Sequence, residues 1–185
     1  MNKASIYKKK IFDAAMLKFK YKNVNQVPKL EKICINSGIG DVANDAKQVE
    51  ACAKEIEAIT GQKPILTYAK KAIAAFKIRE GQPIGVKVTL RGERMWNFVE
   101  NLCNVALPRV RDFKGLPIGS FDKQTNYTLG VKEQIIFTEI NFENVKKIRG
   151  FNVTFVISTS SNSQEEALVL LRAIGLPIVK SRKGI

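Results

Sequence analysis

Residues 61–94 read GQKPILTYAKKAIAAFKIREGQPIGVKVTLRGER, and two stretches within them alternate between apolar and polar side chains. Alternation with a period of two is typical of a strand that has one buried and one exposed face. It predicts strands at residues 64–69 and 85–91. In the second strand the inward residues are Val86, Val88 and Leu90. The outward residues are Lys87, Thr89 and Arg91.

The same pattern predicts further strands outside this segment, and apolar residues at helical spacing predict helices. The further strands are expected at residues 30–36, 127–131 and 151–159. The helices are expected at residues 5–20, about 44–60, about 93–106, and from Asn162 or Ser163 to Gly175. Two stretches are expected to be loops, a basic irregular one at residues 70–82 and a long ordered one at residues 109–123.

The order of these elements is strand–helix–strand–strand–helix, then an insertion, then strand–helix. It predicts an α+β fold, a two-layer sandwich of ferredoxin-like type with a largely antiparallel sheet. Residues 1–185 would form a single domain to which residues 1–28 are appended as a basic N-terminal helix. All the helices would cover one face of the sheet and leave the other face open. The open face would carry Lys32, Asn36, Thr67, Lys87, Thr89 and Arg91.

The chain is strongly basic, with 31 Lys and Arg residues against 17 Asp and Glu and a net charge of +14. Residues 61–94 hold eight of the basic residues and only two glutamates, whereas residues 33–60 hold five acidic residues and two lysines. Such an imbalance opposes folding slightly and is typical of a protein that binds a polyanion. Nucleic acid is the first candidate, because a sheet face rich in Lys, Arg, Thr and Asn suits RNA.

An anionic membrane surface is the second candidate. It would require a basic amphipathic helix, and only residues 5–20 could supply a short one. The chain has no apolar run of the ~18 residues that a membrane span needs. Its basic start, MNKASIYKKK, does not lead into the apolar stretch of a signal peptide.

Residues 36–43, NSGIGDVA, match the pattern G-x-G-x-x-A and favour a third alternative, a dinucleotide-binding enzyme. Asp41 and Asp45 argue against it, because they stand where a pyrophosphate would dock on the helix N-terminus. The next strand is followed by Lys70 and Lys71, which would suit a 2′-phosphate but not a ribose hydroxyl. A tight turn is the other interpretation of these glycines.

The chain has no histidine, which removes the commonest general base and most zinc sites. Its cysteines, Cys34, Cys52 and Cys103, are widely spaced and odd in number. We interpret them as small buried apolar residues in a reducing compartment rather than as metal ligands or a disulfide. Both features argue against a catalytic residue, a metal site or a cofactor, without excluding an enzyme.

Three aromatic features need interpretation. Residues 149–155, RGFNVTF, resemble an RNA-binding signature faintly, but Asn152 and Thr154 occupy the positions that would stack on bases, so a core strand is the better interpretation. Trp96 is expected in the core or against a partner. Phe76 lies in the basic loop and either folds inward as an anchor or stacks on RNA, and both interpretations stay open.

Nearly the whole chain resembles one family. The stretches that carry the resemblance are LEKICINSGIG, TGQKPILTYAKKAIAAFKIREGQPIGVKVTLRGERMWNF, ALPRVRDFKGL, NYTLGVKEQIIFTEI and EEALVLLRAIGLP. They are similar to the large-subunit ribosomal protein five family in its bacterial form, whose members bind 5S rRNA.

The resemblance implies a non-enzymatic constituent of the large subunit of the cytoplasmic ribosome. It implies binding to 5S rRNA, linkage of that RNA to 23S rRNA in the central protuberance, and contact with P-site tRNA during translation. Further implied partners are small-subunit ribosomal protein thirteen, through an intersubunit bridge, and neighbouring large-subunit proteins. The rRNA-binding residues would be Lys32, Asn36, Lys63, Thr67, Lys87, Thr89, Arg91 and Arg94. The tRNA-binding residues would be Lys70, Lys71, Phe76, Lys77 and Arg79.

Overall fold

The computed structural model describes residues 3–40, 46–140, 145 and 147–179. Its α-helices are α1 (Lys3–Phe19), α2 (Ala46–Thr60), α3 (Gly92–Asn101) and α4 (Gln164–Ala173). Its strands are β1 (Lys29–Gly38), β2 (Ile65–Tyr68), β3 (Pro83–Leu90), β4 (Leu116–Pro117), β5 (Tyr127–Val131), β6 (Phe151–Ser158) and β7 (Ile178–Val179). The boundaries lie within two residues of the predicted ones, except at the end of α3.

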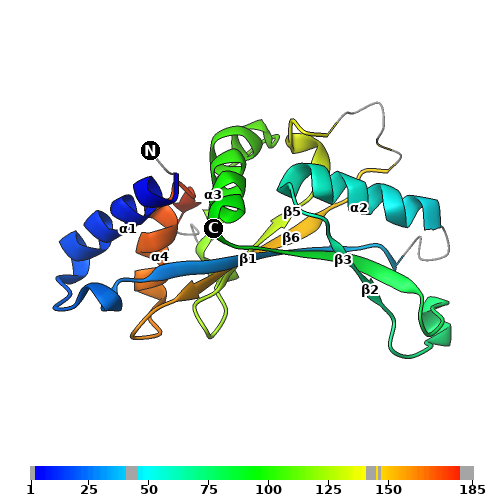
Figure 1. The fold of residues 1–185 in the computed structure, drawn as a ribbon, viewed down its shortest axis with the longest axis horizontal. Coiled ribbons are helices and arrows are strands. Elements are labelled where there is room, and N and C mark those ends of the chain that lie inside the picture. The colour runs from blue at the N-terminus through cyan, green and yellow to red at the C-terminus, as the bar shows by residue number, and fades with distance from the viewer. Residues whose placement is uncertain (1–2, 41–45, 141–144, 146, 180–185) are drawn as a thin grey trace, which may run out of the picture.

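Among the described residues the main sheet has five strands in the order β2-β3-β1-β6-β5, and every neighbouring pair is antiparallel. Strands β1, β2, β3 and β6 with helices α2 and α3 form a split β-α-β-β-α-β unit, and β5 is added at the edge beside β6. Figure 1 shows the described α-helices on one side of this sheet and none on the other side. The predicted α+β sandwich of ferredoxin-like type is confirmed.

The hydrophobic core lies between the helices and the sheet. Its strand residues follow the predicted alternation, and Ile33, Val86 and Leu90 are fully buried. The apolar residues of the last helix are buried as well, and Ser163 begins this helix by accepting a hydrogen bond from the backbone N–H of Glu165. The buried apolar residues at this helix are Ala167, Leu170, Leu171 and Ile174.

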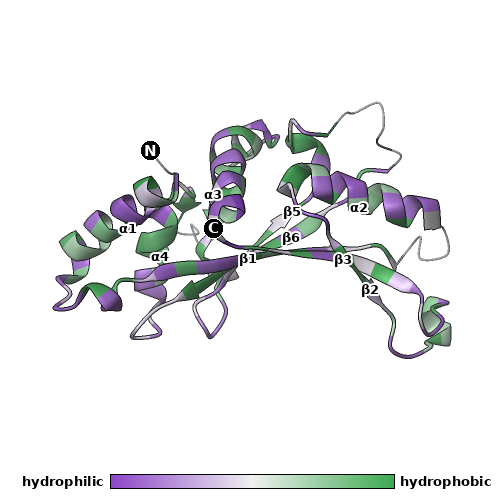
Figure 2. Ribbon diagram, in the orientation of Figure 1, coloured by the Kyte–Doolittle hydropathy of each residue, from purple (hydrophilic) through white to green (hydrophobic). Residues whose placement is uncertain are grey.

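The basic helix α1 packs against α3 and α4. Ile11 and Ala15 are buried in these contacts, and the ring of Tyr7 stacks on Trp96 with a centroid distance of 5.3 Å. Trp96 is only 3% exposed, so its assignment to the core is confirmed. Figure 2 shows hydrophilic and hydrophobic residues side by side on each helix, as expected for helices that cover a core. No helix in the described ranges has the length and apolar composition of a membrane span.

The structure differs from the prediction at the end of α3. The α-helix ends at Asn101 and continues as a π-helical turn, Leu102–Ala106, and a 3₁₀ turn, Leu107–Arg109. Pro108 explains the change, because proline lacks the backbone N–H and its ring collides with the carbonyl group four residues earlier in a regular helix. The long loop that follows contains β4, which pairs in parallel with β7.

Candidate nucleic-acid interface

The side of the sheet without helices is a largely polar surface, which we call the open face. Asn36 on β1 lies opposite Lys87 on β3 and Asn152 on β6, and Cys34 lies opposite Thr89. Directly opposite residues of antiparallel strands point to the same side, so the register defines the face. Its residues are Lys32, Cys34, Asn36, Gly38, Ile65, Thr67, Gly85, Lys87, Thr89, Thr128, Gly130, Asn152, Thr154 and Val156.

Five of the predicted rRNA-binding residues lie on the open face. Asn36 and Lys87 are exposed, whereas Lys32, Thr67 and Thr89 are half-buried. Neither lysine forms an ion pair with any described residue. Their ammonium groups are therefore available for phosphate groups, while the hydroxyl and amide groups beside them can hydrogen-bond to a ligand.

Two glycines face each other at the end of the β1–β3 pairing. A Cβ atom on Gly85 would lie 2.7 Å from Thr67 Oγ1 and 3.1 Å from the carbonyl oxygen of Ser37. Gly38 lies opposite Gly85, and a Cβ atom there would meet nothing within 4 Å. The space above Gly85 is therefore filled by Thr67, and only Gly38 leaves room for a ligand to approach the backbone closely.

The other half of the open face carries neutral polar groups that the sequence reasoning did not assign to a site. The hydroxyl groups of Thr128 and Thr154 lie 3.1 Å apart, and Asn152 is exposed next to Gly130. Phe151 and the other inward residues of β6 are buried in the core, as predicted. Its outward residues could have been found from the same period of two, which places every second residue of RGFNVTF on the open face.

Three predicted rRNA-binding residues lie beyond the strands. Lys63 is exposed in the segment that leads into β2, and Arg91 is the exposed residue that precedes α3. Arg94 is in the first turn of α3, where its Nη1 donates a 3.5 Å hydrogen bond to Gln62 Oε1. Arg94 therefore belongs to the helix layer rather than to the sheet surface.

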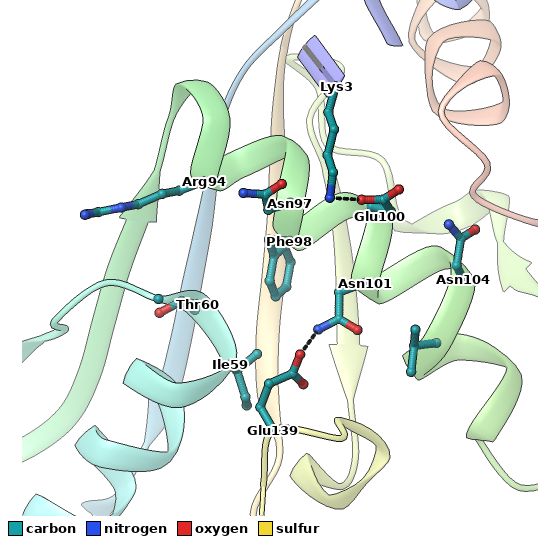
Figure 3. A pocket seen from close by; sticks show the side chains of 12 residues that line it. Lys3, Ile59, Thr60, Arg94, Asn97, Phe98, Glu100, Asn101, Asn104 and Glu139 are labelled. Carbon is teal, nitrogen blue, oxygen red and sulfur yellow. Dashed lines mark hydrogen bonds and ion pairs between the residues drawn. The ribbon is translucent and has the colours of Figure 1, made fainter. Parts of the chain in front are cut away.

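Figure 3 shows Arg94 at the rim of a groove between α2 and α3, with its side chain turned away from the groove. The groove has a volume of about 680 Å³. Its carboxylates are already engaged, because Glu100 pairs with Lys3 and Glu139 accepts a hydrogen bond from Asn101. This groove therefore presents no free cluster of charge to a polyanion.

The segment between β2 and β3 is an ordered extension of the hairpin, not the irregular loop that was predicted. Ile73 and Ile78 exchange two backbone hydrogen bonds of 2.9 and 3.2 Å, and Ala69 and Gln82 are joined at the base by a third of 2.8 Å. The turn at the tip is the 3₁₀ turn Ala74–Phe76. We call residues 69–82 the β2–β3 arm; Figure 1 shows it projecting from the sheet.

All the predicted tRNA-binding residues lie on this arm and are exposed. Phe76 is 71% exposed and Ile73 is 46% exposed, so the arm carries an apolar tip, visible in Figure 2. The interpretation of Phe76 as an inward anchor is wrong. Lys77 follows it in the left-handed conformation, with φ of 53°, and ends the turn. The basic residues around the tip are Lys70, Lys71, Lys77 and Arg79.

The motif of the dinucleotide alternative is only partly described. Gly38 ends β1 and Gly40 follows it, but Asp41, Ala43 and Asp45 lie outside the described residues. Within the described ranges no group of three or more His, Cys, Asp or Glu side chains could hold a metal ion.

Comparison with known proteins identifies the family. Residues 23–79 match the family model described as ribosomal protein L5, and residues 83–178 match the model for the C-terminus of the same ribosomal family. The chain belongs to the ribosomal protein L5 family. It is 54% identical over 178 residues to large ribosomal subunit protein uL5 of Malacoplasma penetrans, covering 96% of this chain and 94% of that protein. It is 56% identical over 174 residues to the uL5 protein of Mycoplasma pneumoniae, covering 94% and 96%.

A third relative, the uL5 protein of Desulforamulus reducens, is 56% identical over 165 residues, covering 89% of this chain and 90% of that protein. The matches extend across the open face and the β2–β3 arm. Because ribosomal protein L5 is a structural, non-enzymatic component, membership of this family decides against the dinucleotide-binding enzyme.

Proposed function

We propose that this protein, a structural constituent of the large subunit of the cytoplasmic ribosome, binds 5S rRNA through its open face. The observation that carries the proposal is a helix-free sheet surface whose lysines, Lys32 and Lys87, have no ion-pair partner among the described residues. The open-face residues, all of them within the described strands, include no carboxylate. This arrangement favours phosphate over any cationic or apolar ligand.

In this mechanism the cations and the neutral groups have separate tasks. Lys32, Lys87 and the neighbouring Arg91 supply affinity by neutralising phosphates and releasing counterions. Asn36 and Thr89 hydrogen-bond to the RNA and fix its register, since phosphate contacts alone do not distinguish sequences. The ligand is expected to be an irregular RNA loop, whose bases are accessible, rather than a regular duplex, whose bases are not.

The proposal includes the other partners of the family resemblance. The protein links 5S rRNA to 23S rRNA, contacts small-subunit ribosomal protein thirteen and neighbouring large-subunit proteins, and reaches P-site tRNA with the β2–β3 arm. An exposed Phe76 among Lys71, Lys77 and Arg79 supports the tRNA contact, because single-stranded or unstacked bases stack on aromatic rings flanked by cations.

The test measures 5S rRNA binding by Lys32→Ala and Arg91→Ala across a series of salt concentrations. Each variant should bind more weakly, and the slope of log K against log salt should fall by about 0.7–0.9 for each lost phosphate contact. Lys54→Ala, which removes an exposed lysine of α2, is the matched control and should leave the slope unchanged. Unchanged slopes for both open-face variants would reject the proposal.

A further inference from the structure

The β2–β3 arm has a fixed base and a fixed tip. At the base, the N–H of the buried Ala69 donates to the carbonyl oxygen of Gln82 at 2.8 Å, and the N–H of Gly81 donates to the carbonyl oxygen of Ala69 at 3.0 Å. At the tip, the two backbone hydrogen bonds between Ile73 and Ile78 close the 3₁₀ turn. The direction of the tip relative to the sheet therefore depends on the two stretches of chain that join the tip to the base.

These two stretches are held differently. Residues 70–72 form no backbone hydrogen bond with any other described residue. On the opposite side of the arm, Arg79 and Gln82 are joined twice. The backbone N–H of Gln82 donates to the carbonyl oxygen of Arg79 at 3.3 Å, and the side-chain Oε1 of Gln82 accepts from the backbone N–H of Arg79 at 2.7 Å. The turn from Arg79 to Gln82 therefore fixes the angle between the base and the tip.

The sequence meets the two backbone requirements of this turn. Gly81 has φ of 78°, the positive value that a type II turn requires at its third residue. A Cβ atom at Gly81 would meet nothing within 4 Å, so the requirement is one of backbone conformation and not of space. Pro83 follows Gln82 and restricts it to extended conformations. Gln82 is half-buried whereas Arg79 is exposed, so the better-anchored residue holds the more mobile one.

We propose that Gln82 is a positioning residue of the β2–β3 arm, and that its amide oxygen, by holding the N–H of Arg79, sets the direction in which the arm presents Phe76 and Arg79 to tRNA. The inference rests on the proposed tRNA contact and adds to it a residue that acts through Arg79. The apparent affinity for a ligand falls in proportion to the fraction of molecules in the binding-competent conformation. Without this hydrogen bond the arm samples further directions, and fewer molecules present the tip to tRNA.

The test measures the affinity for P-site tRNA of ribosomes that carry Gln82→Met. Methionine keeps the unbranched shape of glutamine but lacks its amide oxygen. The net contribution of one hydrogen bond corresponds to roughly 2- to 10-fold weaker tRNA binding, and 5S rRNA binding by the free protein should not change. Gly81→Ala strains the same turn and should weaken tRNA binding as well, whereas Gly81→Asn tolerates the positive φ and should retain most of the affinity. Gln164→Met, at an exposed position of α4, is the matched control.

A double-mutant cycle separates positioning from a contact that Gln82 makes by itself. In the background Phe76→Ala/Arg79→Ala, Gln82→Met should weaken tRNA binding by less than about 2-fold, because the side chains that it positions are gone. The full loss in that background would overturn the inference. Normal tRNA binding by Gln82→Met would also overturn it, if Phe76→Ala/Arg79→Ala itself binds more weakly. Normal tRNA binding by the background variant would instead refute the proposed tRNA contact.

Discussion

Replacing Phe76 with alanine should weaken the contact of the β2–β3 arm with tRNA and leave the fold intact. The side chain is 71% exposed, so less than a third of its surface is covered by the protein. A phenylalanine side chain has an area of about 200 Å². At about 25 cal/mol per Å², the covered part contributes at most ~1.5 kcal/mol to folding, an upper bound because the unfolded chain also covers some of it.

The expected effect on tRNA is of similar size or larger. Stacking of a base on an aromatic ring contributes about 1–3 kcal/mol, which corresponds to roughly 5- to 150-fold in affinity. The assay measures the dissociation rate of P-site tRNA from ribosomes that carry Phe76→Ala. Phe76→Tyr keeps the ring and should restore slow dissociation. Leu17→Ala on α1, where the side chain is 86% exposed, is the control for truncation of an exposed apolar residue.

Two outcomes would refute this reasoning. If tRNA dissociates from Phe76→Ala ribosomes at the unaltered rate while 5S rRNA binding is intact, the arm does not stack on tRNA. If 5S rRNA binding is lost together with tRNA retention, the arm and the open face do not act separately.

Two further predictions concern the open face and the edge of the sheet. Iodoacetamide should alkylate Cys34 in the free protein, since Cys52 is buried and burial raises the pKa of Cys103 to about 12. Saturating 5S rRNA should slow the alkylation of Cys34 at least ~10-fold. Equal alkylation rates with and without 5S rRNA would contradict the placement of RNA on the open face. Gly150→Ala should lower the free energy of unfolding by about 1–3 kcal/mol in a urea titration, because the new Cβ atom would lie 2.6 Å from a backbone carbonyl oxygen at the end of β5. Gly130→Ala, whose Cβ atom would have its nearest neighbour at 3.6 Å, is the matched control and should change stability by less than half as much.

The sheet and its exposed surface were predictable because their signal is local. In β3, strict alternation assigns each residue to a face, and Lys87 and Thr89 lie where that alternation places them. The last helix was predictable for a similar reason. Its apolar residues recur at helical spacing, and Ser163 and Gly175 stand at its two ends.

The β2–β3 arm was not predictable in the same way. The sequence of residues 70–82, KKAIAAFKIREGQ, does not alternate between apolar and polar residues. The conformation of the arm is fixed by backbone hydrogen bonds such as those between Ile73 and Ile78, which do not depend on the side-chain pattern. The orientation of Phe76 depends on this geometry, so the sequence left both of its interpretations open. The pairing of Leu116 with Ile178 is a further case, because it joins segments far apart in the chain and periodicity reports only near neighbours.

Attraction of RNA and recognition of RNA depend on different groups of the open face. Helix α2 carries three glutamates against two lysines, whereas the open face carries lysines and no carboxylate. The Debye length at physiological ionic strength is about 8 Å, and a helix is itself about 10 Å across. Charges on the far side of the helix layer are therefore largely screened from an RNA that approaches the open face. Mutations of the open-face lysines should therefore act mainly on the association rate. Asn36, Thr89 and the glycines interact with RNA only at contact distance. Substitutions at these positions should therefore change the dissociation rate and the discrimination between RNAs.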